Sequence, residues 1–237
     1  MKDYDLFGRA FLDFYNGTPH PLYLERDDGH VDGQGMDVYF AGFEDFQPAE
    51  KKALQHVKGK VLDIGVGAGR VALHLQQSGH DVVGIDLSPS AVEVSKRRGV
   101  KVVKRMSACD MRFPEASFDT AIAFCNNLGL CGTVLGVESM MRDLHRIVRP
   151  GGVFLASSIQ PTRTKNPHHL RYHKRNRALG LPPGQVRLRE RYGNTVGPWW
   201  DLLMVTPSEM RALCKRTEWH IDKVYRGVMD VYVLARV

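Results

Sequence analysis

Short apolar runs alternate with longer amphipathic stretches through the middle of the chain. The runs lie at 61–64, 81–86, 101–105, 118–124 and 153–157. Such runs are typical of parallel strands that are covered on both faces. Between them, apolar residues recur with helical spacing. The clearest set lies before Pro150 and consists of Met140, Met141, Leu144, Ile147 and Val148. Strands that alternate with helices predict an α/β fold with a mainly parallel sheet.

The two ends of the chain carry different patterns. Residues 219–225 and 230–236 are two apolar stretches separated by Gly227, which predicts a pair of antiparallel strands. Residues 3–15 have an aromatic-rich helical pattern that lies outside the alternating region. Two arrangements are open for this first helix, because it could cover a ligand site as a lid or pack on the outer helices of the sheet.

The decapeptide VLDIGVGAGR at 61–70 joins the first run to a glycine turn that opens a helix. Gly65, Gly67 and Gly69 allow a sharp turn and close approach of the backbone to a ligand. A dinucleotide fingerprint requires a third glycine where this chain has Arg70, and the carboxylate of Asp63 would repel a pyrophosphate. The turn therefore indicates a nucleotide-like cofactor that carries positive charge instead of phosphate.

A second acid follows at the spacing expected for a residue that holds ribose hydroxyls. Asp86 ends the run at 81–86, about twenty residues after the glycine turn, and Ser88 and Pro89 then predict a helix start. The glycine turn, Asp86, Asp110 in the segment SACDM and the R-P-G-G-x-F turn at 149–154 together resemble class I S-adenosylmethionine-dependent methyltransferases.

The resemblance implies a seven-stranded Rossmann-like sheet with an antiparallel last strand, an N-terminal lid at 1–45 and a methyltransferase domain at 46–237. It implies S-adenosyl-L-methionine as cofactor and methyl transfer to a small acceptor as activity. The residues that it assigns to the cofactor are Asp63, Gly65, Gly67, Gly69, Asp86, Leu87, Asp110, Met111 and Asn126.

The composition narrows the classes of protein to which the chain could belong. The 237 residues, 43% hydrophobic and 25% charged, are typical of one globular α/β domain with a cap. No apolar run is long enough to span a membrane, and the first residues lack the apolar core of a signal peptide. The four cysteines have no C-x-x-C pair and no metal-ligand spacing, which predicts a reduced, cytoplasmic protein. A monomer or a homodimer is expected.

Positive charge is concentrated after the fifth predicted strand. Residues 161–200 hold nine lysines and arginines and one acid, Glu190. Because loops at the carboxyl ends of strands overhang the ligand crevice, this insertion is expected to cap the acceptor site. Three interpretations are open: a solvated helix face around 168–179, recruitment of a small acidic or aromatic acceptor, and binding of RNA.

Candidates for a general base are Tyr15, His169 and His173, since an amine, hydroxyl or thiol acceptor could require removal of a proton. His169 and His173 are four positions apart, as a helical metal pair would be, but no nearby carboxylate completes a ligand set. No metal is therefore expected. An RNA methyltransferase and a non-catalytic cofactor-binding protein are the alternative functions.

Overall fold

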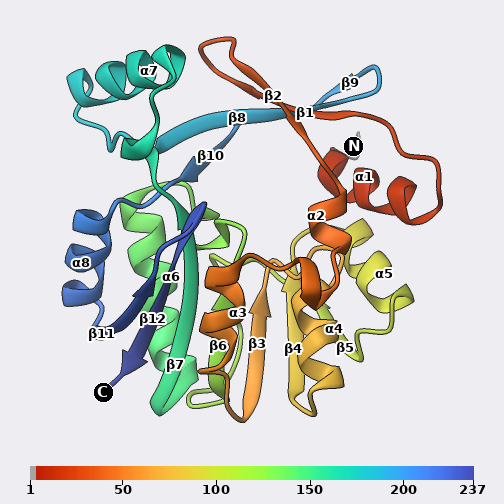
Figure 1. Cartoon of the computed structure of the whole chain (residues 1–237), viewed down its shortest axis with the longest axis vertical. Helices are drawn as coiled ribbons and strands as arrows, with labels where there is room; N and C mark the ends of the chain where they lie inside the picture. The colour runs from red at the N-terminus through yellow and green to blue at the C-terminus, as the bar shows by residue number, and fades with distance from the viewer. Residues whose placement is uncertain (1–3) are drawn as a thin grey trace.

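The structure, a computed structural model, describes residues 4–237 and contains two sheets, one above the other (Figure 1). The central sheet has seven strands in the order β11-β12-β7-β6-β3-β4-β5. Its strands are β3 (Lys60–Ile64), β4 (Asp81–Asp86), β5 (Val102–Arg105), β6 (Phe118–Ala123), β7 (Val148–Ile159), β11 (Trp219–Tyr225) and β12 (Met229–Arg236). Strands β3 to β7 pair in parallel, whereas β12 is antiparallel to both of its neighbours.

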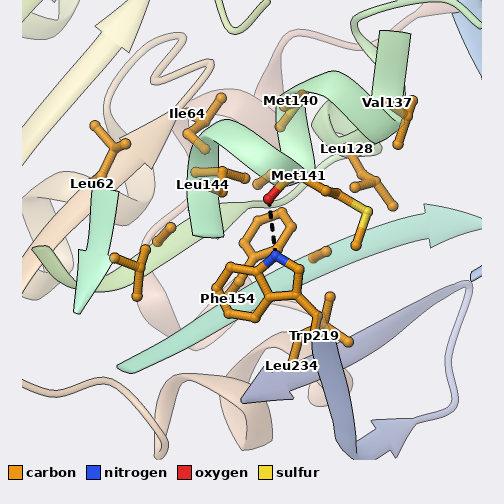
Figure 2. Close-up of a cluster of buried hydrophobic side chains, with 14 of the residues drawn as sticks. Leu62, Ile64, Leu128, Val137, Met140, Met141, Leu144, Phe154, Trp219 and Leu234 are labelled. Atoms are coloured by element: carbon orange, nitrogen blue, oxygen red, sulfur yellow. Dashed lines mark hydrogen bonds between the residues drawn. The ribbon is translucent and has the colours of Figure 1, made fainter. Parts of the chain in front are cut away.

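Helices cover both faces of the central sheet. The helices that follow or flank its strands are α3 (Pro48–Leu54), α4 (Arg70–Gln77), α5 (Pro89–Arg97), α6 (Val134–Ile147) and α8 (Pro207–Arg216). Side chains alternate along each strand, so Leu62 and Ile64 of β3 pack with α6 and α8 while Val61 packs with α3 and α4. On the α6 side, the indole nitrogen of Trp219 donates a hydrogen bond to the carbonyl oxygen of Met141 at 3.0 Å (Figure 2).

The second sheet lies over the carboxyl ends of the parallel strands, and we call it the roof sheet (Figure 1). Its order is β10-β8-β1-β2, with β9 paired to β8, and all of its pairs are antiparallel. Its strands are β1 (Leu22–Arg26), β2 (Val31–Gln34), β8 (Gln185–Tyr192), β9 (Thr195–Val196) and β10 (Trp200–Leu203). The roof therefore combines the N-terminal region with the insertion after β7.

Three helices flank the roof. These are α1 (Leu6–Tyr15), α2 (Asp37–Phe40) and α7 (Pro167–Ala178), and short 3-10 turns lie at Phe43–Asp45, Asn127–Gly129 and Pro161–Arg163. Helix α1 packs on α5, where Leu6, Ala10 and Phe11 join a core cluster with Ala91 and Val94. Packing on an outer helix of the sheet, one of the two expected arrangements, is thus observed. Phe7 and Phe11 of α1 also line a cavity beneath the roof, and a lid over a ligand stays a prediction.

The predicted elements compare well with the observed ones in the central sheet. The seven-stranded sheet, the strand at 81–86, the antiparallel final pair and the helix start at Ser88 are confirmed, and the Ser88 hydroxyl accepts the Ala91 N–H at 2.9 Å. The strand expected at 153–157 is longer, because β7 begins at Val148 and includes the proline-glycine segment. The helix expected at 3–15 is observed from Leu6, and position 3 lies outside the described residues.

The roof was not predicted. One of the three interpretations of the insertion includes a helix around 168–179, which is observed as α7, but none includes the strands β8, β9 and β10 that follow it. The expectation of reduced cysteines was also wrong for two of the four, because Cys109 and Cys131 form a disulfide. Across residues 4–237, no helix combines the length and the apolarity needed to cross a membrane.

Candidate functional site

The glycine turn between β3 and α4 requires glycine at all three positions. Gly65, Gly67 and Gly69 have φ values of 69°, 53° and 85°, in the left-handed region that a side chain disfavours. A Cβ on Gly65 would also collide with the amide of Asn127, which donates to the carbonyl oxygens of Ile64 and Gly65 at 2.8 and 3.0 Å. The turn is thus held open toward the space beneath the roof.

Two carboxylates flank this turn. Asp86, at the end of β4, accepts the Gly67 N–H at 3.0 Å through one oxygen and the Ser88 N–H at 2.9 Å through the other. A carboxylate has about four lone-pair sites, so each oxygen retains capacity toward a ligand. Burial raises the pKa of Asp86 and raises that of Asp63 to about 7. Both groups would gain stability from a hydroxyl donor or a cation placed beside them.

Among residues 4–237, Arg70 is the arginine at this turn that lines the cavity, and its charge is already paired. The guanidinium of Arg70 is committed to both oxygens of the buried Glu50, at 2.6 and 3.0 Å, and stacks over the ring of Phe46. Two carboxylates beside an arginine that is paired with Glu50 fit a cofactor that has hydroxyls and an ammonium group and lacks phosphate. S-adenosylmethionine meets this description, and a dinucleotide does not.

A cavity of about 1120 Å³ extends from the glycine turn to the inner face of the roof. Its lower part is lined by Asp63, Gly65, Gly67, Asp86 and Leu87, and Gly69 lies beneath it as the N-cap of α4. Its sides include Phe7 and Phe11 of α1 together with Met106 and Ser107–Cys109 after β5. The space therefore offers a polar floor and apolar walls, as small-molecule sites usually do.

Four predicted site residues lie outside the cavity lining: Gly69, Asp110, Met111 and Tyr15. Asp110 is exposed, pairs with Arg112 at 2.7 Å and is not part of the cavity lining, and Met111 is buried in the core. Tyr15 is 41% exposed and also outside the lining. Asn126 reaches the lining, but its side-chain oxygen accepts from Ser158 and Ile159 and its amide donates to Leu203. The structure thus places Asn126 as a brace between β7 and the roof.

The side chains of β8 alternate between the two faces of the roof. Val186, Leu188 and Glu190 line the cavity, whereas Arg187, Arg189 and Arg191 lie on the opposite face of the same strand. Arg189 and Arg191 pair with Glu25, a neighbour on that outer face. The positive charge of the insertion therefore does not line the cavity along this strand. The alternation V-R-L-R-E-R-Y is the sequence signal that identifies both faces.

Histidines enter the cavity from α7. His169 and His173 both line it, and burial lowers the pKa of each ring, so both are neutral at pH 7. The Nδ1 of His169 lies 3.0 Å from the guanidinium of Arg26, which can only donate, so this nitrogen accepts and Nε2 carries the proton. His173 is 5% exposed, and its ring has no hydrogen bond to any residue in 4–237.

A metal role for these histidines has no support in the geometry. Within residues 4–237, no three His, Cys, Asp or Glu side chains are grouped closely enough to hold a metal ion.

Comparisons with known proteins identify the lower part of this site. The family described as "Methyltransferase domain" matches residues 62–156, which include the glycine turn and Asp86. A SAM-dependent methyltransferase from Bacteroides fragilis, solved with S-adenosyl-L-homocysteine, matches 98% of this chain and 94% of its own, with a TM-score of 0.81 and 26% identity. Residues 62–156 therefore match the methyltransferase domain family, and the chain has the fold of S-adenosylmethionine-dependent methyltransferases.

Curated relatives match less than half of the chain. A demethylmenaquinone methyltransferase from Tropheryma whipplei is 30% identical over 97 residues, which are 39% of this chain and 38% of that protein. A ubiquinone biosynthesis O-methyltransferase from Methylocella silvestris is 31% identical over 121 residues, 48% of this chain and 46% of that protein. The chain thus spans less than half the length of these relatives, and the roof lies outside the matched family segment.

The rim of the methyltransferase cavity is cross-linked. Cys109, in the segment after β5, forms a disulfide with Cys131, which follows the turn after β6, and both residues line the cavity. The bond ties together two loops that leave the carboxyl ends of different strands. It was missed in the sequence because the two cysteines have no recognisable spacing.

Proposed function

We propose that this protein transfers a methyl group from S-adenosylmethionine to a small molecule that is held beneath the roof sheet. The observation that carries the proposal is the single cavity of about 1120 Å³ that joins the glycine turn and Asp86 to the roof residues. Small-molecule sites usually measure about 300–1,000 Å³, so this space is large enough for a cofactor and an acceptor together.

The cofactor supplies a methyl group that is electrophilic because it is attached to a sulfonium. The chain's contribution is to bind, orient and exclude water. Asp86 is positioned to accept from ribose hydroxyls, and Asp63 is positioned to neutralise an ammonium group. Phe7 and Phe11 of α1 and the apolar residues of the roof keep water from the reacting centre. Alignment of the two ligands in one enclosed space supplies much of the rate.

His173 is the residue best placed to accept a proton from the acceptor. It is neutral, nearly buried, open to the cavity and free of protein hydrogen bonds within the described chain. His169 is assigned a different role, because the proton on its Nε2 makes it a donor toward an oxygen or nitrogen of the acceptor. Tyr15, outside the cavity lining, is not retained as a base.

Replacement of His173 tests this assignment. We expect His173→Gln to lower kcat by about 10²–10⁴-fold, the usual contribution of a general base, without a change in cofactor affinity. His168→Gln is the matched control, since His168 is exposed on the same helix and contacts Arg171 outside the cavity. An equal loss in both variants would contradict the role of His173.

The names of the relatives support a small acceptor and do not identify it. One relative is named a demethylmenaquinone methyltransferase and another a ubiquinone biosynthesis O-methyltransferase, but the matches cover only 39% and 48% of this chain. The anionic acceptor expected from the charge of the insertion is weakened by the placement of Arg187, Arg189 and Arg191 outside the cavity. Their outer position leaves RNA binding as the alternative to be tested.

The decisive experiment is incubation with methyl-labelled S-adenosylmethionine and a cell extract that is then separated into RNA, protein and small-molecule fractions. We expect label in the small-molecule fraction, and none with Asp86→Ala. Label in RNA would favour the RNA methyltransferase. Cofactor binding by calorimetry without label in any fraction would favour a non-catalytic protein.

A further inference from the structure

The inner face of the roof sheet carries an acid that the proposed reaction has not used. Residues that pair across an antiparallel sheet point to the same face. Glu190 of β8 pairs with Leu24 of β1, and Leu24 pairs with Asp32 of β2. All three line the cavity, so this row of the roof presents two carboxylates to the acceptor space.

The positively charged side chains beside these paired roof residues already have partners. Arg26 donates to both oxygens of Asp28 at 2.8 Å and to His169, and its guanidinium stacks over Tyr172 at 4.2 Å. Asp32 has an imidazole partner, since the His30 ring lies 3.2 Å from its carboxylate. Glu190 is different, because its carboxylate forms no ion pair with any residue in 4–237.

The environment of Glu190 is unfavourable for an isolated charge. Burial raises the pKa of its carboxyl group. The indole nitrogen of the neighbouring Trp200 is buried and has no hydrogen-bond partner among residues 4–237. A partly buried carboxylate without a cation is stabilised when a ligand supplies one. The ring of Trp200 also lines the cavity and can contact a cation through its face. His173, nearly buried and unpartnered on α7, is a second polar group directed into the same space.

We propose that the acceptor is a small amine and that Glu190 selects it by pairing with its ammonium form. This inference rests on the proposed methyl transfer. The ammonium loses one proton to the neutral imidazole of His173, and its nitrogen lone pair forms the new N–C bond. The bond from that methyl carbon to sulfur breaks, and its electron pair stays on sulfur. The proton on His173 then passes to water, which restores the base.

Three probes of similar shape distinguish the acceptor charge: 2-phenylethylamine, 2-phenylethanol and 3-phenylpropanoate. Their affinities are measured by calorimetry on the full chain saturated with S-adenosylhomocysteine. We expect the amine to bind roughly tenfold or more tighter than the alcohol, as for a hydrogen bond to a charged group, and the carboxylate to bind most weakly. Glu190→Gln should remove the preference for the amine and leave the affinity for S-adenosylhomocysteine unchanged.

Glu25→Gln is the matched control, because Glu25 lies on the outer face of the same sheet and pairs with Arg189. It should retain the amine preference. The inference is overturned if the wild-type protein shows no amine preference, or if that preference survives in Glu190→Gln. It is also overturned if Glu190→Gln weakens only S-adenosylhomocysteine, since the carboxylate would then serve the cofactor. Failure of the wild-type protein to bind S-adenosylhomocysteine would instead contradict the proposed function.

Discussion

The central sheet and the roof sheet build two halves of one cavity from opposite kinds of sequence information. In the central sheet, the residues proposed to bind the cofactor lie close together in the chain, from Asp63 through the glycine turn to Asp86. In the roof, Glu25 meets Arg189 across 164 positions of sequence. The first half is specified by a local motif with fixed geometry. The second is specified by strand pairing between distant segments, and no short motif marks it.

The largest expected effect is a loss of affinity for the cofactor product when Asp86, in the cofactor half of the cavity, is replaced. Asp86→Ala removes two hydrogen-bond acceptors for the cofactor, each worth about 1.5–3 kcal/mol when charged, so we expect about a thousandfold loss of affinity for S-adenosylhomocysteine. Because Asp86 also holds the Gly67 and Ser88 amides, Asp86→Asn provides a milder variant. Asp81→Ala, at the exposed opposite end of β4, should bind normally. Unchanged calorimetric affinity in both Asp86 variants would remove the assignment.

The next largest effect is a loss of folding stability when the disulfide at the rim of the cofactor half is reduced. Reduction of the Cys109–Cys131 disulfide, which closes a loop with a sequence separation of 22, should lower the free energy of unfolding by about 3 kcal/mol. Urea unfolding with and without reductant measures this difference. A Cys109→Ser/Cys131→Ser double variant should have the lower stability and no response to reductant. An equal response to reductant in that variant would place the effect elsewhere in the protein.

A smaller loss of folding stability is expected where the turn after β6 contacts the roof sheet. Gly129, in the turn after β6, lies so close to the backbone of Leu203 in β10 that a Cβ would collide with its carbonyl oxygen. Gly129→Ala should therefore destabilise the protein by about 2 kcal/mol through overpacking. Gly42→Ala, where a Cβ meets open space, should change stability little. If the two variants unfold at the same urea concentration, the contact between the halves is looser than the structure indicates.

Substitutions on the outer face of the roof sheet should have the smallest effect on methyl transfer. Arg187→Ser and Arg191→Ser change exposed residues outside the cavity, so methyl transfer to the small-molecule fraction should change by less than about twofold. The same variants would weaken an RNA methyltransferase strongly, with a reduced dependence of affinity on salt. A large loss of activity in either variant would move the acceptor site to this outer face.

The same contrast explains how far the sequence alone could predict the molecule. The strand at 81–86, the cap at Ser88 and the final antiparallel pair follow from local patterns, and the structure has all three. Asp110 was misplaced because spacing after β5 does not determine which loop residues turn inward; here Ser107–Cys109 line the cavity and Asp110 pairs with Arg112.

The roof could not be predicted from local patterns in the same way. Strand β1 shows no clear periodicity, and its partner β8 is distant in the chain. The insertion is strongly basic in total, but the three arginines of β8 alternate with residues that line the cavity. The alternating pattern of β8 was readable, but the face that it turns to the acceptor depends on pairing that only the three-dimensional structure supplies.

The pairing of β1 with β8 also constrains the order in which the chain can fold. During synthesis from the N-terminus, β1 and β2 emerge first but remain a two-stranded hairpin, which is marginally stable by itself. The parallel strands β3 to β7 can assemble while the ribosome still holds the insertion, since their contacts lie closer together in sequence. The nascent chain would therefore release the parallel strands of its cofactor half first, the acceptor chamber would close after β8 and β10 are released, and β11 and β12 would complete the central sheet last.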